Sequence, residues 1–593
     1  MPRSSSPRYV PLPRNSSDAN EFNYEFKDKS VSSKRIASKL LRAFKRICKP
    51  TYIFIFFILF FCWQIIFNAS YTNPPKFSIP NDEKVFIAAN IVDPNLIDGL
   101  WGDNLVALVD GIGKERVFVS VYGGPKASLE RLNERLHGVQ KKIVAEVDDA
   151  IDLSTLHRVT LPSGQTRVKR IEYLADVRNK ALDPLTSGEV TEKYDRVLFL
   201  NDVLFEVEGA MRLLWGTNVN DEGKAEYKAV CGADFITSWK FYDTYATRDT
   251  EGYSIGVPIF PWFGGKGEST SRNDVLAGKD AVRVKSCWGG IVAFDARFFQ
   301  KEIANTTSSN SKAREPEDSN HIYERTTSPS ELPLKFRSEP ESFWDSSECC
   351  LIHADILATP DFPDLTTNTN EAWGEGIFMN PFVRVAYDAK SFNNIKYAKR
   401  FERLFVPWQA IINHFAHLPR FNDRRGEREG DIVNDRLWIP NSFTAEQEQA
   451  MIDLQKDFGG KNGSAPKSTD NKNQERRDLG DEDSTWQGID SLQASSASSY
   501  FSAIVGGLKS RAEVSSPSRI MHAKRQMTPN EGAIAKPKGY WEREGHYVDY
   551  ERVARKGGYC GVRQLTVLRE GVIGIGEKGW ENLRGEVPPR EVQ

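Results

Sequence analysis

The sequence predicts an α/β fold, a mostly parallel β-sheet with helices on both faces, behind a single membrane-spanning helix near the N-terminus. Two patterns predict it. Between Asn81 and Gln300, short apolar runs alternate with stretches in which apolar residues recur at helical spacing. Ahead of that region, a long apolar run follows directly on a block of basic residues.

Composition narrows the class of protein. A chain of 593 residues is too long for one ordinary core. The 79 Lys and Arg residues nearly balance the 81 Asp and Glu residues, which argues against bulk electrostatic binding of nucleic acid. The seven cysteines contain no Cys-x-x-Cys pair, so a zinc cluster is not expected.

The basic block and the apolar run predict a signal anchor. Seven basic residues and no acid lie between Lys34 and Lys49, and the run Thr51–Phe67 has Gln64 as its only strongly polar member. As a helix the run would be roughly 26 Å long, enough for a thin bilayer. A cleaved signal peptide would have a shorter leader, and a buried core helix would not follow a block of cations. Residues 1–50 are therefore expected in the cytosol and the remainder in the lumen, as a single-pass type II protein of the Golgi (or ER) membrane.

A lumenal location changes how later residues are interpreted. Asn68, Asn305 and Asn462 begin glycosylation sequons by pattern. Cysteines after the anchor face an oxidising compartment and can form disulfides, although their pairing cannot be read from the sequence. These cysteines are Cys231, Cys287, Cys349, Cys350 and Cys560.

The first part of the lumenal region has the expected βα alternation. Strands are expected at Val85–Ile91, Val117–Tyr122, Ile143–Val147 and Val197–Leu200. Helical stripes are expected over 97–108, 129–139 and 171–182. In parallel sheets of this kind, ligands bind beyond the carboxyl ends of the strands. Polar residues at those ends are therefore the candidates for a site.

Composition also suggests boundaries along the chain. A stem is expected over residues 68–84 and the main domain over 85–420, with 302–341 as a polar loop insertion. Residues 421–539 are charged and of low complexity, and much of that segment cannot bury enough apolar surface to fold alone. Residues 540–593 regain aromatic side chains and form a small C-terminal segment whose packing the sequence leaves open.

Two polar features lie at the expected sheet edge. Asp202 follows the apolar run that ends at Leu200, where a carboxylate can hold a divalent cation on a diphosphate. Alone, it is better explained as part of a turn that caps the next helix. Arg178 and Asn179 lie on a predicted helix; Arg178 can pair with a nucleotide phosphate or orient a carboxylate, or it can simply belong to a solvated helix face.

Two further features lie later in the domain. Trp288 offers a flat apolar face of the kind on which sugars stack, and Gly289 and Gly290 allow close approach of a backbone to a ligand. A tight turn with a core tryptophan explains the same residues equally well. Asp345 and Glu348 lie among aromatic residues and cysteines, where acids are costly unless paired or functional. A helix N-cap explains part of that pattern.

Together these features occur in the order seen in one family. The sequence resembles the fungal alpha-1,3-mannosyltransferases of the capsule-associated type, glycosyltransferase family 69, from about Val85 to Pro419. The matching pieces are VFIAANIVDPNLI, LADVRNKAL, VLFLNDV, CGADF, SCWGGIVAFDA and FWDSSECCLIHADI. Of the usual Asp-x-Asp metal motif, Leu200-Asn201-Asp202 keeps only the final Asp.

The resemblance implies a GT-A-like nucleotide-sugar-binding domain that transfers mannose from GDP-mannose to a mannoside acceptor with an alpha-1,3 linkage and retention of configuration. It implies Mn²⁺ (or Mg²⁺) as cofactor, with Asp202 as metal ligand. Donor binding is assigned to Asn90, Arg178, Asn179 and Asp202, acceptor binding to Trp288, Gly289 and Gly290, and catalysis to Glu348 and, second, Asp345.

Two alternatives stay open at this stage. The first is a transferase that uses another nucleotide sugar, such as UDP-xylose or UDP-galactose. The second is a non-catalytic, membrane-anchored scaffold or lectin for polysaccharide assembly. A scaffold does not require Arg178, Asp202 and Glu348 to converge, whereas a catalytic site does. The oligomeric state is not predicted.

Overall fold

The computed structural model describes residues 49–67, 70–160, 165–301, 332–360, 362, 375–420, 422–441, 444–446, 448–449, 452–453, 545–569 and 579–583. The predictions for the cytosolic tail (apart from its last two residues), the three sequons and most of the low-complexity segment lie outside these residues. The chain divides into two compact units, Met1–Phe67 and Asn68–Gln593. Each unit is described by itself.

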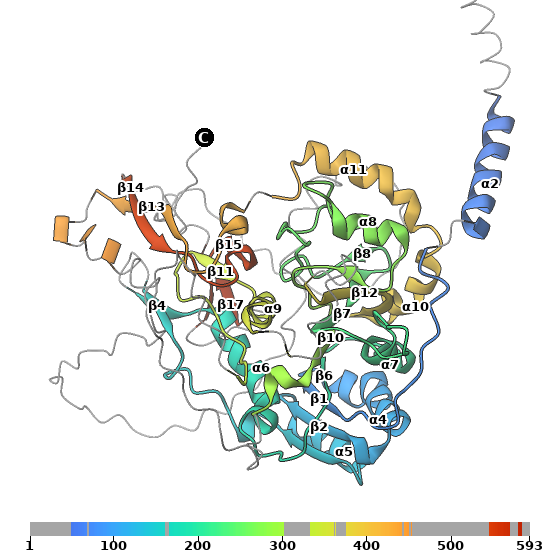
Figure 1. The fold of residues 1–593 in the computed structure, drawn as a ribbon, viewed down its shortest axis with the longest axis horizontal. Coiled ribbons are helices and arrows are strands. Elements are labelled where there is room, and N and C mark those ends of the chain that lie inside the picture. Colours follow the sequence, from blue (N-terminus) through green and yellow to red (C-terminus); the bar gives the residue numbers. More distant parts are fainter. Residues whose placement is uncertain are drawn as a thin grey trace, which may run out of the picture. The chain divides into compact units, whose positions relative to one another are not determined.

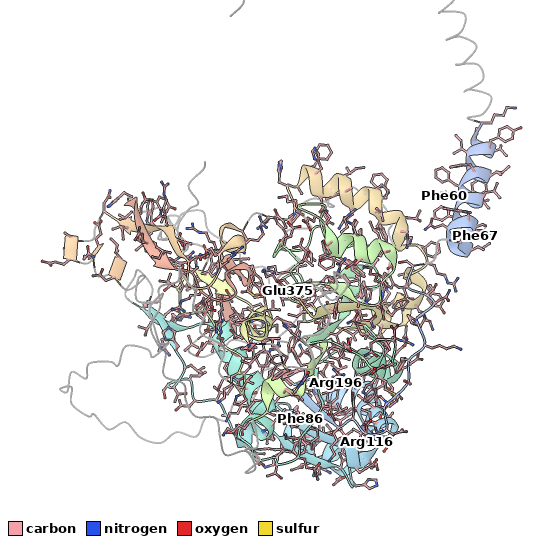
Figure 2. All side chains as sticks on the ribbon, viewed as in Figure 1. Phe60, Phe67, Phe86, Arg116, Arg196 and Glu375 are labelled. Atoms are coloured by element: carbon pink, nitrogen blue, oxygen red, sulfur yellow. A yellow bond between two sulfur atoms is a disulfide. The ribbon has the colours of Figure 1, made fainter. Side chains whose placement is uncertain are left out.

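The described part of the first unit is the helix α2 (Pro50–Phe67). Phe60 and Phe67 project from it in Figure 2, and the side chain of Phe67 is 74% exposed. Among the helices in the described ranges, none combines the length and the hydropathy that crossing a bilayer requires.

The second unit is built on a nine-stranded mixed sheet whose main path runs in the order β3-β2-β1-β6-β10-β7-β12-β9, with β8 paired to β7. The strands are β1 (Val85–Asn90), β2 (Val117–Tyr122), β3 (Gln140–Val144), β6 (Arg196–Leu200), β7 (Ala229–Thr237), β8 (Lys240–Phe241), β9 (Val282–Arg283), β10 (Ile291–Asp295) and β12 (Ile377–Ala386). The neighbours β3, β2, β1 and β6 are parallel, as are β7 and β12, while β10 runs antiparallel to β6 and β7. The prediction of a mostly parallel sheet is therefore confirmed.

Most predicted strands match the structure closely. β1, β2 and β6 coincide with the predicted apolar runs to within one residue. The third prediction, Ile143–Val147, was shifted: β3 begins at Gln140, and residues 146–148 form a 3-10 turn. β3 is an edge strand whose side chains are exposed or half-buried, so its lysines carry no apolar signal.

Helices cover both faces of the sheet, as predicted (Figure 1). α4 (Leu100–Ile112), α5 (Lys126–Arg135) and α7 (Val207–Trp215) contribute to one core, and α6 (Arg170–Thr186) and α9 (Glu348–Ala358) to the other. β1 shows the division, because Ile87 belongs to the first core and Phe86 to the second. Successive side chains of a strand point to opposite faces. The remaining elements of the main body are α3 (Pro94–Ile97), β4 (Arg158–Thr160), β5 (Thr166–Val168), α8 (Thr270–Ala277), β11 (Trp344–Ser346), α10 (Ala389–Ala398) and α11 (Phe405–Phe415).

The C-terminal segment packs back onto the main domain, a question that the sequence left open. β15 (Gly561–Arg563) pairs with β11, and the Cys350–Cys560 disulfide links this segment to α9. The buried guanidinium of Arg248 donates to the carbonyl oxygens of Tyr559 and Cys560 at 2.8 and 2.9 Å. The segment also contributes β14 (Gly545–Val553), paired with β13 (Ile432–Pro440), and the hairpin of β16 (Thr566–Leu568) and β17 (Trp580–Asn582).

Two ranges assigned by composition to loops contain packed residues. Within the predicted insertion, Leu334 and Phe336 are buried in the core formed by α6 and α9. Within the predicted charged segment, β13 supplies one strand of the β13–β14 ribbon. These segments are polar in sequence because ion pairs, such as that between Arg424 and Glu341, contribute to their packing. Their composition therefore did not indicate that they are folded.

The structure shows which of the cysteines after Phe67 are paired. Cys231 pairs with Cys287, joining β7 to the loop before β10, and Cys350 pairs with Cys560. Cys349 is a buried free thiol.

Candidate active site

The sheet register brings the predicted polar residues to one edge. Ala89 pairs with Leu200, so Asn90 and the Asn201-Asp202 turn leave adjacent strands at the same end. β10 runs in the opposite direction, and its first residue, Ile291, also pairs with Leu200. The Trp288–Gly290 turn before β10 therefore lies at this same edge.

The turn after β6 is held on two sides. The backbone N–H of Asn201 donates to the carbonyl of Gly290 at 3.0 Å, and the indole of Trp101 donates to the carbonyl of Asn201 at 2.9 Å. The next helix, α7, has Glu206 as its N-cap residue, so Asp202 does not cap it. Asp202 is half-buried at the strand end, as a ligand-facing carboxylate would be.

Arg178 and Glu348 meet beside this turn. Arg178 comes from α6, and Glu348 is the first residue of α9. The Nε atom of Arg178 lies 3.0 Å from Oε1 of Glu348, and its Nη1 atom lies 3.2 Å from Oδ1 of Asn201. The two side chains are only 11% and 4% exposed, so Arg178 does not belong to a solvated helix face. Of the two functional interpretations, orientation of a carboxylate is the one the geometry supports.

The neighbours of Arg178 keep its buried guanidinium charged. Burial by itself would lower the pKa of Arg178, but the neighbouring groups, Cys349 and Glu348 first and Asp202 after them, raise it above its ordinary value. A buried cation without such partners would be strongly destabilising. Arg178 and Glu348 thus meet beside the Asn201-Asp202 turn, as a catalytic site requires and a scaffold does not.

The indole ring of Trp288 makes a cation–π contact with Arg178. The guanidinium lies 4.3 Å from the centroid of the Trp288 ring, and Phe199 and Phe336 pack around the same ring. Trp288 is 4% exposed. In this structure one face of the indole holds the arginine, so a sugar cannot stack on that face.

The two glycines after Trp288 allow their turn to lie close to the backbone of a neighbouring strand. Gly289 and Gly290 have φ angles of +58° and +67°. A Cβ atom on Gly289 would lie 2.0 Å from the carbonyl oxygen of Gly232 in β7. The close approach is therefore to the neighbouring strand, and the turn-with-core-tryptophan interpretation accounts for this geometry.

The two asparagines assigned to donor binding differ. The amide of Asn179 both donates to and accepts from the backbone of Phe336, at 2.9 and 2.8 Å, which occupies its amide group in holding that loop. Asn90 donates through Nδ2 to the carbonyl of Val177 at 2.9 Å. Its Oδ1 atom is buried and has no hydrogen-bond partner among the described residues. A buried acceptor of this kind can accept a hydrogen bond from a ligand hydroxyl.

Asp345 lies in a different buried pair. It is on β11, with Oδ1 3.7 Å from the Nζ atom of Lys169. The ammonium group of Lys169 also donates to the carbonyls of Glu339, Glu341 and Trp344. Burial raises the pKa of Asp345 above its usual range. Asp345 thus pairs with Lys169, whereas Glu348 pairs with Arg178.

Two acids at this edge were not singled out from the sequence. Asp243 accepts the backbone N–H of Trp288 at 3.0 Å, and its own N–H donates to Asp234 at 3.0 Å. Asp234 also accepts the hydroxyl of Tyr387 at 2.9 Å. Burial, and after it the charge of Asp243, raises the pKa of Asp234 to about 7. The only sequence signal was the CGADF piece, since Asp243 follows no apolar run.

The donor set for a metal is small. Among the residues that the structure describes, no group of three or more His, Cys, Asp or Glu side chains could hold a metal ion. Asp202 is a single hard-oxygen ligand at the end of a strand. Mg²⁺ and Mn²⁺ are commonly bound by one or two carboxylates together with substrate phosphates. Asp202 fits that mode of binding but not an all-protein metal site.

An α/β sheet with a buried Arg–Glu pair and a carboxylate at its carboxyl edge suits an enzyme acting on a nucleotide-linked substrate. Residues 84–355 match the family model described as Cryptococcal mannosyltransferase 1. The alpha-1,3-mannosyltransferase CMT1 of Cryptococcus neoformans var. neoformans serotype D is 22% identical over 219 residues, which are 33% of this chain and 43% of that protein. The matched region thus spans less than half of the relative. These findings support a glycosyltransferase and a domain of the capsule-type mannosyltransferases.

Two solved structures align with this chain at low similarity. Glucosyl-3-phosphoglycerate synthase from Mycobacterium tuberculosis, crystallised with Mn²⁺, UDP and phosphoglyceric acid, aligns with a TM-score of 0.25 and 11% identity over 62% of this chain and 89% of its own. A mycobacterial protein aligns with a TM-score of 0.24 and 11% identity over 63% and 87%. Scores this low carry no argument about ligands.

Proposed function

We propose that the protein transfers mannose from GDP-mannose to a mannoside acceptor, forming an alpha-1,3 linkage with retention of configuration, on a GT-A-like domain. The observation that carries the proposal is the meeting of Arg178 and Glu348 beside the Asn201-Asp202 turn at the carboxyl edge of the sheet. The family match and the name of the curated relative support mannose as the sugar and alpha-1,3 as the linkage.

On the donor side, this chain supplies oxygen ligands and an unfilled acceptor. Asp202 would hold Mn²⁺ (or Mg²⁺) together with the diphosphate, and the ion would neutralise charge on the departing nucleotide. Oδ1 of Asn90 would accept a hydrogen bond from a hydroxyl group of the nucleotide sugar. That bond would remove the free-energy cost of leaving a buried amide oxygen unpaired.

On the sugar side, Glu348 is the proposed catalytic carboxylate. Glycosyl transfer develops positive charge at the anomeric carbon, and a fixed carboxylate stabilises that charge. Arg178 is a positioning residue, because its 3.0 Å contact with Oε1 of Glu348 fixes the carboxylate. Asp345 stays the second candidate for the carboxylate, and the Trp288–Gly290 turn is assigned to the support of Arg178 instead of to the acceptor.

A donor screen with the full-length protein in detergent tests the proposal. GDP-mannose, UDP-xylose and UDP-galactose would be offered with a mannoside acceptor, with Mn²⁺ or with EDTA. We expect transfer from GDP-mannose alone, dependent on the metal, and an alpha-1,3 product by NMR. Transfer from a UDP-sugar would replace the proposed donor. Glycan binding without transfer from any donor would favour the scaffold or lectin alternative.

We also propose a type II topology in the Golgi (or ER) membrane with the catalytic domain in the lumen. The support is the cation block before Thr51, the exposed apolar side chains of α2, and two disulfides, which persist in oxidising compartments. Protease treatment of sealed microsomes should remove an N-terminal tag and spare a C-terminal one. Protection of the N-terminal tag would reverse the topology.

A further inference from the structure

Helix α11 turns two amide side chains inward and three large apolar side chains outward. Its two buried residues are Gln409 and Asn413. Trp408, Ile411 and Phe415 are 62%, 48% and 78% exposed. Their spacing of three and four residues places them on one side of the helix, here named the α11 face. A surface helix of a globular protein normally shows the reverse arrangement.

The polar contacts fix this orientation. The amide of Gln409 donates to the carbonyl of Phe263 at 3.2 Å and accepts from Arg272 of α8. Oδ1 of Asn413 accepts the N–H of Val257 at 2.7 Å. Rotating the helix to bury its apolar side would break these bonds and bury unpaired amides. The outward apolar face is therefore built into the packing.

The α11 face continues onto neighbouring elements. Trp239 is 44% exposed and stacks on Phe405, the first residue of α11, with 6.0 Å between ring centroids. Figure 1 shows α11 at the periphery of the second unit. Several large exposed aromatic side chains in one region indicate an interaction surface.

Charge favours one kind of partner. Residues 389–420 contain six Lys and Arg residues and a single acid, Glu402. Glu402 is buried in a two-bond ion pair with Arg384, so it does not offset the surface charge. The exposed cations include Lys390, Lys396 and Arg400. A second copy of this face would meet like charge, whereas lipid phosphates offer the complement.

We infer that the α11 face docks onto the headgroup region of a phospholipid bilayer. Trp, Ile and Phe side chains enter the boundary between headgroups and acyl chains, and the exposed cations of residues 389–420 bind lipid phosphates, as in helices that lie in the membrane interface. The contact is separate from mannosyl transfer and from the proposed anchor, and it would hold one side of the catalytic domain against the membrane.

A local probe in the full-length protein tests this contact. In a background with Cys48→Ser and Cys62→Ser, which removes the exposed thiol of Cys62 and the thiol of Cys48 outside the described residues, an environment-sensitive fluorophore is attached at Phe415→Cys. The matched control carries it at Glu115→Cys, whose native side chain is 78% exposed on another element. Vesicles of phosphatidylcholine with phosphatidylserine are added, with and without brominated acyl chains. We expect a blue shift and at least about threefold quenching at 415 only.

Substitutions on the face provide the second measurement. Trp408→Ser combined with Ile411→Ser should reduce the vesicle response of the probe at 415 at least about tenfold, because apolar area no longer enters the interface. The buried amides are untouched, so the melting temperature and the transfer to a soluble acceptor should not change. Lys390→Glu with Lys396→Glu should weaken binding most for anionic vesicles.

Three outcomes would overturn the inference. A probe at 415 that stays in water when vesicles bind, or an equal response at 115, means that the face does not contact lipid. A probe already shielded without vesicles, independently of protein concentration, means that another segment of this chain covers the face. Shielding that grows with protein concentration means that a second copy does.

Discussion

The substitution Glu348→Gln tests whether the Glu348 carboxylate acts in catalysis or only stabilises the fold. The substitution keeps the shape of the side chain and removes its charge. At 3.0 Å and an effective dielectric constant of about 20, the attraction between Arg178 and Glu348 is about 5 kcal/mol before desolvation is counted. Removing one partner of a buried pair typically costs about 3–5 kcal/mol, and we expect the lower end because the amide oxygen can still accept from Arg178. The melting temperature should fall by several degrees.

The effect on turnover should be larger than the effect on stability explains. A lost electrostatic group at a transition state reduces the rate on the order of 100- to 1000-fold. Donor binding, measured by calorimetry, should persist, because Glu348 is assigned to the sugar and not to the diphosphate. Single-turnover transfer of mannose measures the chemical step.

Glu402→Gln is the matched control. It breaks the buried pair with Arg384, at 2.8 and 2.9 Å, on elements outside the candidate site. It should lower the melting temperature by a similar amount and leave the transfer rate of the folded enzyme unchanged. If Glu348→Gln is destabilised but transfers mannose at the wild-type rate, Glu348 only joins α9 to α6, and the catalytic assignment is refuted.

Three further predictions concern other residues. Asp202→Ala should raise the dissociation constant of GDP-mannose at least about tenfold and remove its dependence on Mn²⁺, as measured by calorimetry with and without metal; unchanged affinity would remove Asp202 from the donor site. Because the pKa of Asp234 rises from 3.8 to about 7 on folding, its contribution to stability is complete below about pH 4 and is lost as the pH rises through 7. Chemical denaturation from pH 4 to 8 should show that slope in Asp110→Asn, whose carboxylate is 54% exposed, and a flatter profile in Asp234→Asn. Replacing both Cys350 and Cys560 by Ser opens a link across 210 residues and should reduce the free energy of unfolding by about 4 kcal/mol in calorimetry; an unchanged melting curve would show that the C-terminal segment is held without it.

Local pattern was enough to predict the framework of the domain. β1, β2 and β6 are buried on both faces and are therefore continuous apolar runs that stand out in the sequence. The edge strand β3 was predicted in a shifted position, and the ribbon of β13 and β14 was not predicted, because exposed strands keep charged side chains. The motifs that carry the family resemblance could likewise be recognised in the sequence, since each is a short contiguous segment.

Pairing across long separations had to come from the tertiary structure. The contact between Arg178 and Glu348 spans 170 positions, and the disulfide to Cys560 spans 210. No local period encodes such partners, because they are set by which helices share a face of the sheet. The same applies to Trp288, whose apolar ring suited a sugar or a core equally until Arg178 was found stacked on it.

The sequence by itself determined the class of fold, the polar residues at strand ends and the likeness to capsule-type mannosyltransferases. Those features can be recognised from the spacing of apolar residues and from short contiguous motifs. The tertiary structure decided which of several equally polar residues share an environment: Glu348 with Arg178, Asp345 with Lys169, and Asn179 with the backbone of Phe336. The physical reason is that a buried charge or amide is stable only beside its partner, and chain folding alone brings partners from distant elements together.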